Sequence, residues 1–174
     1  LCEVYNLHEA AAYWRQVVTL NDWQQDRFVG NILRSMFNTV AGKRIALLGF
    51  AFKADTGDTR ESPAIRVARL LAEEHAQVVV CDPQALGNAR QDLADLGGRI
   101  VYEPDPYVAT RGADAVAVLT DWTCFRELDY GRVYAGMRQP AFLFDGRNCV
   151  DHAALHRLGF NVHAVGKPAL SHLN

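Results

Sequence analysis

The sequence predicts an α/β fold, in which helices cover both faces of a doubly wound parallel sheet of about six strands. One supporting observation is that short apolar runs alternate with segments of helical periodicity. A second is that these runs are nearly continuous, which is typical of strands buried on both faces. Right-handed crossovers then place every strand-to-helix loop at one edge of a Rossmann-like sheet.

Two helical segments are expected before the sheet. Residues 1–20 carry apolar side chains on roughly one face, and Asn21 is positioned to cap a second helix. From Val29 to Val40, apolar residues recur at the spacing of a strongly amphipathic helix, which Ala41 and Gly42 are expected to end. So wide an apolar face needs a partner, either the chain's own sheet or a surface outside it.

The stretch from Lys43 to Arg66 predicts a strand, a long polar loop and a helix. The strand is the apolar run Ile45–Leu48, and Gly49 ends it. The loop runs from Phe50 to Arg60, and Ser62–Pro63 supplies an N-cap followed by a proline in the first helical turn. This order aims loop amides and a helix N-terminus at the region beyond the strand, where parallel sheets bind phosphorylated ligands.

Two basic side chains suit this loop to an anion. Lys53 supplies a mobile charge, and Arg60 supplies a planar donor fork for phosphate or carboxylate oxygens. The loop differs from the G-x-G-x-x-G dinucleotide fingerprint, because Phe50, Ala51 and Phe52 follow the glycine that ends the strand. The pattern favours an anion-binding turn, with an ordinary solvated surface loop as the alternative.

The rest of the chain repeats the alternation. An acid after the second strand holds a ribose in dinucleotide folds, but without the glycine fingerprint Asp82 is interpreted as a turn residue. Asp121 is expected to start the helix that runs through Glu127. Further strands are expected at Gln77–Cys81, Arg99–Tyr102, Ala115–Leu119, Ala141–Phe144 and Asn161–Val165, and further helices at Gln84–Leu96, Pro104–Arg111, Tyr130–Met137 and His152–Leu158.

Arg147 follows the fifth strand, in the turn Asp145–Arg147. It is therefore expected at the same sheet edge as Lys53 and Arg60, so that two distant stretches bring three cations to one rim. A ligand anion is one use for these cations. The alternative is that neighbouring aspartates engage them in ion pairs.

Composition argues against several classes of function. A net charge of -2 gives no electrostatic case for binding nucleic acid or an anionic membrane. No apolar run reaches the roughly 20 residues of a transmembrane helix, and the first residues lack the basic start and apolar core of a signal peptide. We expect a piece of a longer cytoplasmic enzyme.

The cysteines and histidines do not suggest a metal site. The four cysteines lack C-x-x-C spacing, which favours buried, reduced thiols over a disulfide framework or a zinc site. His152 and His156 share a helix face, but no third ligand accompanies them, so a solvated helix face is expected.

The loop Gly49–Ser62 reads GFAFKADTGDTRES, and Phe142–Arg147 reads FLFDGR. In these stretches, and over essentially the whole chain, the sequence resembles the C-terminal nucleotide-sugar-binding domain of the UDP-glucose/GDP-mannose dehydrogenase family. The loop is most similar to members that oxidise UDP-glucose, because other relatives tend to differ at Thr56–Thr59. The resemblance implies that residues 1–41 belong to a central helical dimerisation domain of a homo-oligomer and that residues 42–174 form the UDP-sugar-binding domain.

The resemblance also implies roles for the rim. Phe52 and Lys53 would contact the nucleotide sugar, Arg147 would reach it as well, and Arg60 would touch the NAD cofactor. The implied reaction oxidises UDP-glucose to UDP-glucuronate by two hydride transfers to NAD, through a thioester on a cysteine. That cysteine and the main NAD domain are expected upstream of Leu1, so this chain contributes no catalytic residue and is expected to be inactive alone.

Three alternatives remain open at this point. In the first, the parent enzyme is a dehydrogenase for UDP-N-acetylmannosamine or GDP-mannose. In the second, the chain is a non-catalytic nucleotide-binding module. In the third, the chain serves mainly in assembly.

Overall fold

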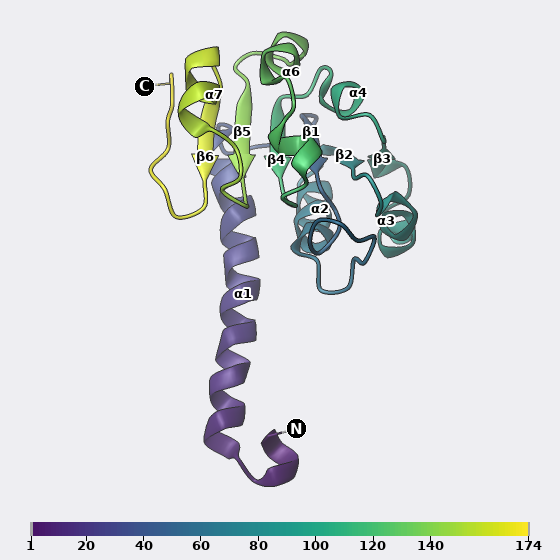
Figure 1. Cartoon of the computed structure of the whole chain (residues 1–174), viewed down its shortest axis with the longest axis vertical. Helices are drawn as coiled ribbons and strands as arrows, with labels where there is room; N and C mark the ends of the chain where they lie inside the picture. Colours follow the sequence, from purple (N-terminus) through teal and green to yellow (C-terminus); the bar gives the residue numbers. More distant parts are fainter. Residues whose placement is uncertain (1, 174) are drawn as a thin grey trace.

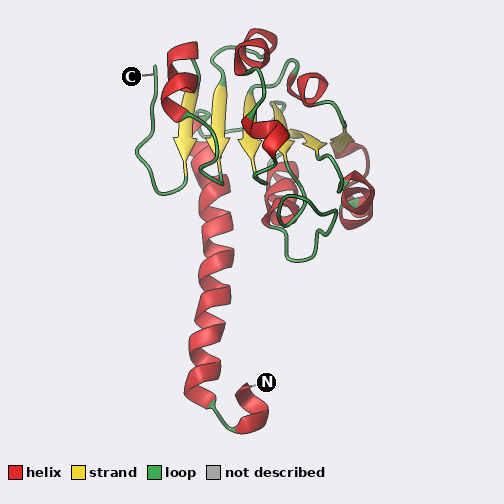
Figure 2. Cartoon of the chain, viewed as in Figure 1, coloured by secondary structure: helices red, strands yellow, loops and turns green. Residues whose placement is uncertain are grey.

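The computed structural model describes residues 2–173, and in them the strands form one six-stranded sheet in the order β3-β2-β1-β4-β5-β6 (Figures 1 and 2). Every neighbouring pair of strands is parallel, as predicted. The strands are β1 (Arg44–Leu48), β2 (Gln77–Cys81), β3 (Ile100–Tyr102), β4 (Ala115–Val118), β5 (Phe142–Asp145) and β6 (Asn161–Ala164).

The order of the strands determines which face each helix covers. The chain winds outward from β1 through β2 to β3, returns to β4, and winds the other way to β6. Right-handed crossovers therefore place α2 and α3 on one face and α4, α6 and α7 on the other. The helices are α1 (His8–Ser35), α2 (Pro63–Glu73), α3 (Leu86–Asp92), α4 (Pro106–Thr110), α5 (Thr123–Arg126), α6 (Tyr130–Gly136) and α7 (His152–Leu158), with 3₁₀ turns η1 (Cys2–Tyr5) and η2 (Ala94–Arg99).

The first helix differs from the prediction. Instead of two helices with a cap at Asn21, α1 is a single helix, because neither glycine nor proline interrupts the chain near that position. It ends at Ser35, earlier than expected, since Phe37 and Asn38 take left-handed backbone conformations with φ of 65° and 59°. The ammonium of Lys43 donates to the carbonyls of Met36 and Thr39, which satisfies acceptors at this helix end.

The two halves of α1 have different surroundings. The second half packs on β5, where the ring of Phe28 meets that of Phe144 edge to face at 6.5 Å, and Ile32 is fully buried. This half covers sheet surface that α2 and α3 leave open. The first half extends away from the sheet (Figure 1), and Tyr13, Trp14 and other large apolar residues on it are exposed. The chain's own sheet therefore covers apolar residues of the second half of α1 and leaves the large apolar residues of the first half exposed.

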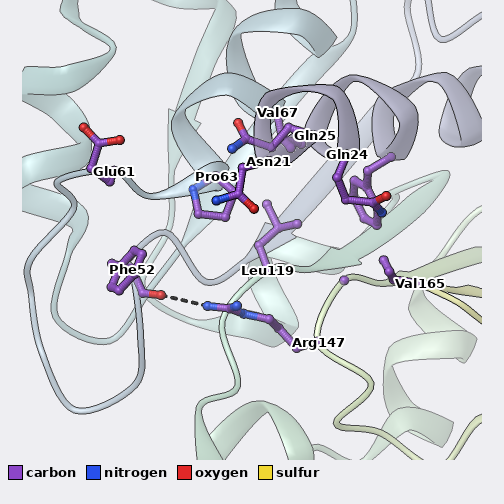
Figure 3. A pocket seen from close by; sticks show the side chains of 12 residues that line it. Asn21, Gln24, Gln25, Phe52, Glu61, Pro63, Val67, Leu119, Arg147 and Val165 are labelled. Carbon is purple, nitrogen blue, oxygen red and sulfur yellow. Dashed lines mark hydrogen bonds between the residues drawn. The ribbon is translucent and has the colours of Figure 1, made fainter. Parts of the chain in front are cut away.

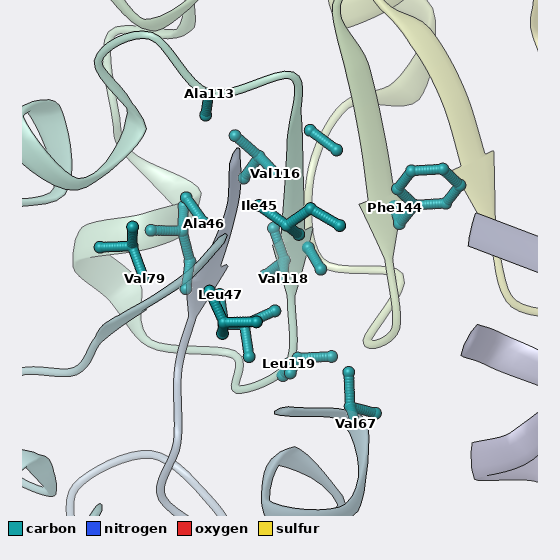
Figure 4. Packing of buried hydrophobic residues seen from close by; sticks show 14 of the residues in the cluster. Ile45, Ala46, Leu47, Val67, Val79, Ala113, Val116, Val118, Leu119 and Phe144 are labelled. Carbon is teal, nitrogen blue, oxygen red and sulfur yellow. The ribbon is translucent and has the colours of Figure 1, made fainter. Parts of the chain in front are cut away.

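The core lies between the helical layers and around the central strands. The side chains of β1 from Ile45 to Leu48 and those of β4 are fully buried, in agreement with strands covered on both faces (Figure 4). The helix predicted over Gln84–Leu96 is shorter, because the chain turns into η2 after Leu93. No helix within residues 2–173 is both long and apolar enough to cross a bilayer.

Candidate functional site

The site lies at the carboxyl edge of the sheet, where the loops after β1, β4 and β5 converge. Four side chains line a hollow there of about 350 Å³, which we call the rim hollow: Phe52, Lys53, Asp121 and Arg147. A more apolar cleft of about 270 Å³ adjoins it between α1, α2 and the same edge (Figure 3). Phe52 and Arg147 line both spaces, so these two residues join the hollow to the cleft.

Hydrogen bonds from several elements hold the first two residues of the loop after β1. Phe50 and Ala51 are buried, and their amides donate to Oδ2 of Asp82 at 2.7 and 3.0 Å. The hydroxyl of Ser62 donates to the carbonyl of Phe50 at 2.7 Å, and that of Thr120 donates to the carbonyl of Ala51 at 2.6 Å. The backbone that leads to Phe52 and Lys53 therefore has its polar groups satisfied by the protein itself.

Asp82 does more than the predicted turn residue. Its Oδ1 does accept from the amides of Gln84 and Ala85, at 2.8 and 2.7 Å, as a turn aspartate would. Its Oδ2, however, points back under the loop after β1 and also accepts from the indole Nε1 of Trp122 at 3.1 Å. The side chain thus connects the loops that follow β1, β2 and β4.

Asp145 plays a similar part at the end of β5. Its carboxylate is fully buried and accepts from the amides of Arg147, Cys149 and Val150. His152 Nε2 lies 2.8 Å from Asp145 Oδ2, so the prediction that His152 lies on a solvated helix face is wrong. His152 is the first residue of α7, which follows the turn after β5. Its ring therefore faces that turn, where the buried carboxylate of Asp145 is its partner.

Arg147 links the two principal loops of the site. Its Nη2 donates to the carbonyl of Phe52 at 2.7 Å, the contact that Figure 3 shows as a dashed line. Lys53 is exposed and, within residues 2–173, has no hydrogen bond or ion pair to the protein. The structure therefore brings Phe52, Lys53 and Arg147 together, as expected from the order of the strands, and leaves the ammonium available.

Arg60 lies outside the rim hollow. Its side chain is 88% exposed and makes a two-pronged ion pair with Asp58, with Nε to Oδ1 at 2.9 Å and Nη2 to Oδ2 at 2.6 Å. This is the alternative use that the sequence left open for the cations. The side-chain hydrogen bonds from Arg60 lower the pKa of Asp58 to about 2.

We expect the Asp58 carboxyl of the folded chain to titrate near pH 2. Because folding lowers this pKa, the pair's contribution to stability is fully present above the unfolded carboxyl pKa, about 3.9. This contribution is lost as the pH falls through about 2. The side-chain carboxyl resonance in an NMR titration measures this midpoint. Arg60→Ala should raise it, whereas the lowered pKa of Asp26, which pairs with Arg66, should not move. An unchanged Asp58 midpoint would contradict the pairing.

The prediction that Asp121 starts the helix after β4 is wrong. The residue before α5 is Trp122, and its side chain makes no capping hydrogen bond, while Asp121 is exposed and lines the rim hollow. The sequence pattern of an acid before a helix is the same in both situations. The two situations differ in the direction of the turn. The buried indole of Trp122 fixes that direction by its hydrogen bond to Asp82, so that Asp121 lines the site instead of capping the helix.

The thiols are free and do not resemble an activated nucleophile. Burial raises the pKa of Cys81 to about 12 and that of Cys149 to about 11. Cys124 is exposed, in contrast to the buried thiols expected, and desolvation raises its pKa as well. Among the described residues, no group of histidine, cysteine and acidic side chains has the arrangement of a metal site.

The chain matches the model of one enzyme family and is similar to known enzymes over most of its length. The model of the UDP-glucose/GDP-mannose dehydrogenase family, UDP binding domain, matches residues 46–152. The chain is 48% identical over 97% of its length to UDP-glucose 6-dehydrogenase 2 of Oryza sativa, and 47% identical over 95% of its length to the UDP-glucose 6-dehydrogenase of Caenorhabditis elegans. It spans 39% and 36% of these relatives, so it corresponds to less than half of each.

Solved structures show the same relationship. A UDP-glucose dehydrogenase from Pyrobaculum islandicum superposes with a TM-score of 0.70 at 29% identity, covering 94% of this chain and 33% of that one. The UDP-N-acetyl-mannosamine dehydrogenase of Staphylococcus aureus superposes with a TM-score of 0.69 at 21% identity, covering 95% of this chain and 35% of that one. The second likeness shows a shared fold only.

Proposed function

Because the chain belongs to the UDP-glucose/GDP-mannose dehydrogenase family, we propose that it is the nucleotide-sugar-binding part of an NAD-dependent UDP-glucose 6-dehydrogenase. The full-length protein oxidises the C6 alcohol of UDP-glucose to the carboxylate of UDP-glucuronate. Each of two hydride transfers reduces one NAD, and water supplies the second carboxylate oxygen. The observation that carries the proposal is the convergence of Lys53 and Arg147 on Phe52 at one hollow.

The chemistry of the rim hollow suits a diphosphate. The ammonium of Lys53 lines the hollow and has no partner within residues 2–173, so it meets phosphate oxygens without first breaking a contact there. Arg147 keeps further N–H donors beside the one that it gives to the carbonyl of Phe52. Bonds of this charge-assisted kind are worth about 1.5 to 3 kcal/mol each. The ring of Phe52, about half exposed, offers an apolar surface next to them.

The turn after β1 does not fit the dinucleotide itself. Phe50 is fully buried where a bare glycine backbone approaches a pyrophosphate in dinucleotide folds. The acid after β2, Asp82, gives both carboxylate oxygens to internal N–H donors and has none directed at a ribose. We therefore assign NAD binding mainly to the rest of the full-length protein, with the exposed Arg60 reaching the cofactor from outside the rim hollow.

The remaining assignments follow from the same proposal. Residues 1–41 form part of a central helical dimerisation domain, and residues 42–174 form the UDP-sugar-binding domain. The exposed aromatic residues on the first half of α1, such as Tyr13 and Trp14, support a homo-oligomeric contact there. The catalytic cysteine belongs to another part of the protein, which is consistent with the raised thiol pKa values of Cys81 and Cys149.

The test is NADH formation by the full-length protein with UDP-glucose, UDP-N-acetylmannosamine and GDP-mannose in separate reactions. We expect turnover with UDP-glucose and two NADH for each UDP-glucuronate. A preference for another sugar nucleotide would keep the family and overturn the substrate. One NADH for each product would contradict oxidation to the carboxylate, and no turnover with any of the three would favour a non-catalytic binding module.

A further inference from the structure

We infer that Asp82 is a positioning residue for the nucleotide-sugar loop, an inference that rests on the function proposed above for Phe52 and Lys53. The side chain of Asp82 is 1% exposed and lies beneath the loop after β1, away from the rim hollow. It touches no ligand-facing surface. Its effect on the site is therefore exerted through the backbone that it holds.

The contacts of Asp82 explain why this position holds an acid side chain and not an amide. Within the described residues, its two oxygens accept from the amides of Phe50, Ala51, Gln84 and Ala85 and from the indole of Trp122. All of these partners are N–H donors. A carboxylate has about four lone-pair sites, which these five donors share, and it brings no N–H group of its own, whereas a side-chain amide would direct its two N–H bonds at some of the donors.

The geometry fixes the point from which the ligand residues depart. Phe50 and Ala51 have both amides bound to Asp82 and both carbonyls bound to hydroxyls, so the chain enters Phe52 in one direction. The carbonyl of Phe52 then accepts from Arg147. Displacement of the loop base would move the ring of Phe52, the ammonium of Lys53 and the partner of Arg147 together.

In dinucleotide folds an acid at this position binds the ribose. Here both oxygens of Asp82 are turned inward, and no lone pair is left for a hydroxyl. The same position thus serves the loop of the sugar nucleotide instead of the cofactor. A buried anchor of this kind reduces the ordering that binding would otherwise require, which is the physical basis of preorganisation.

The first experiment compares Asp82→Asn with Asp114→Asn in the full-length protein. Asp114 is the control, because its carboxylate also accepts a backbone amide, that of Arg44 at 2.8 Å, but does so at the opposite edge of the sheet. We expect Asp82→Asn to raise KM for UDP-glucose about tenfold or more, with a smaller change in kcat and none in KM for NAD. Asp114→Asn should leave KM for UDP-glucose unchanged even where it lowers the melting temperature.

A second readout does not depend on turnover. Hydrogen exchange followed by mass spectrometry should show faster exchange of the amides of residues 50–53 in Asp82→Asn and no change there in Asp114→Asn. If Asp82→Asn does not fold, Trp122→Phe removes one donor only and is expected to raise KM about threefold, with faster exchange in the same segment.

The outcomes separate this inference from the proposed function. Wild-type turnover of UDP-glucose together with an unchanged KM and unchanged exchange in Asp82→Asn would overturn the positioning role alone. Equal effects of Asp82→Asn and Asp114→Asn would also overturn it, because a general loss of stability would then explain both. Absence of wild-type turnover would overturn the proposed function, while the exchange comparison would still decide whether Asp82 holds the loop.

Discussion

Lys53→Ala is expected to raise KM of the full-length protein for UDP-glucose about 10- to 100-fold, because a diphosphate loses one charge-assisted partner. The effect should be large, since Lys53 lines the rim hollow and the described part of the chain offers its ammonium no alternative partner. KM for NAD should change little. Steady-state NADH formation with each substrate varied in turn measures both constants.

Two further variants control this experiment. Lys53→Arg keeps the charge with a different shape and is expected to retain part of the affinity. Arg111→Ala removes one exposed positive charge after α4, at the other edge of the sheet, and should leave KM unchanged. If Arg111→Ala weakened UDP-glucose binding as much as Lys53→Ala, a long-range charge effect would replace the contact we propose. An unaltered KM in Lys53→Ala would remove Lys53 from the site.

Gly49→Ala is expected to destabilise the chain by about 3 kcal/mol or more, the range of overpacking combined with backbone strain. Gly49 has a φ of 102°, and a Cβ on it would lie 2.4 Å from the Cβ of Thr120 and 2.5 Å from its backbone nitrogen. Thr120 lies just after β4, and its backbone cannot move away without disturbing the hydrogen bond from the Leu119 amide to the Leu48 carbonyl and the pairing of β1 with β4. Urea denaturation of the chain gives the change in free energy of unfolding.

Gly112→Ala separates the two contributions. Gly112 also has a positive φ, 66°, but an added Cβ there would meet nothing within 4 Å. Its replacement should therefore cost only the strain of a left-handed residue, about 1 to 2 kcal/mol. A loss at Gly49 no larger than the loss at Gly112 would show that the close approach to Thr120 is relieved by a small shift. In that case the loop after β1 is less constrained than its hydrogen bonds indicate.

Local patterns were sufficient to predict most of the fold. The apolar run of β1 is buried on both faces, as its composition indicated. Ser62 caps α2 by accepting the amide of Ala64, with Pro63 in the first turn, as the dipeptide predicted. Such signals depend on neighbours within a few residues, so the sequence alone contains them.

The partners of polar side chains were not predictable in the same way. Asp58 and Arg60 lie two residues apart, and their ion pair could be foreseen only as one possibility. Asp82 and Trp122 lie 40 residues apart in the sequence and meet beneath the loop after β1. The local pattern around Asp82 is the same whether it serves only its own turn or also holds the loop after β1. The difference lies in which N–H donors the fold brings to its Oδ2 atom.

By itself the sequence determined the parallel α/β sheet, the edge at which the loops gather and the cations placed there, because periodicity, caps and crossover handedness act locally or by a general rule. Which cation stays available depends on contacts that form only in the folded chain. Among the described residues the tertiary structure gave Lys53 no partner, and it joined Arg147 to Phe52, paired Arg60 with Asp58 and buried Asp82 under the loop. The reason is that a side chain's partner is set by distances between elements, and these follow from packing of the whole chain.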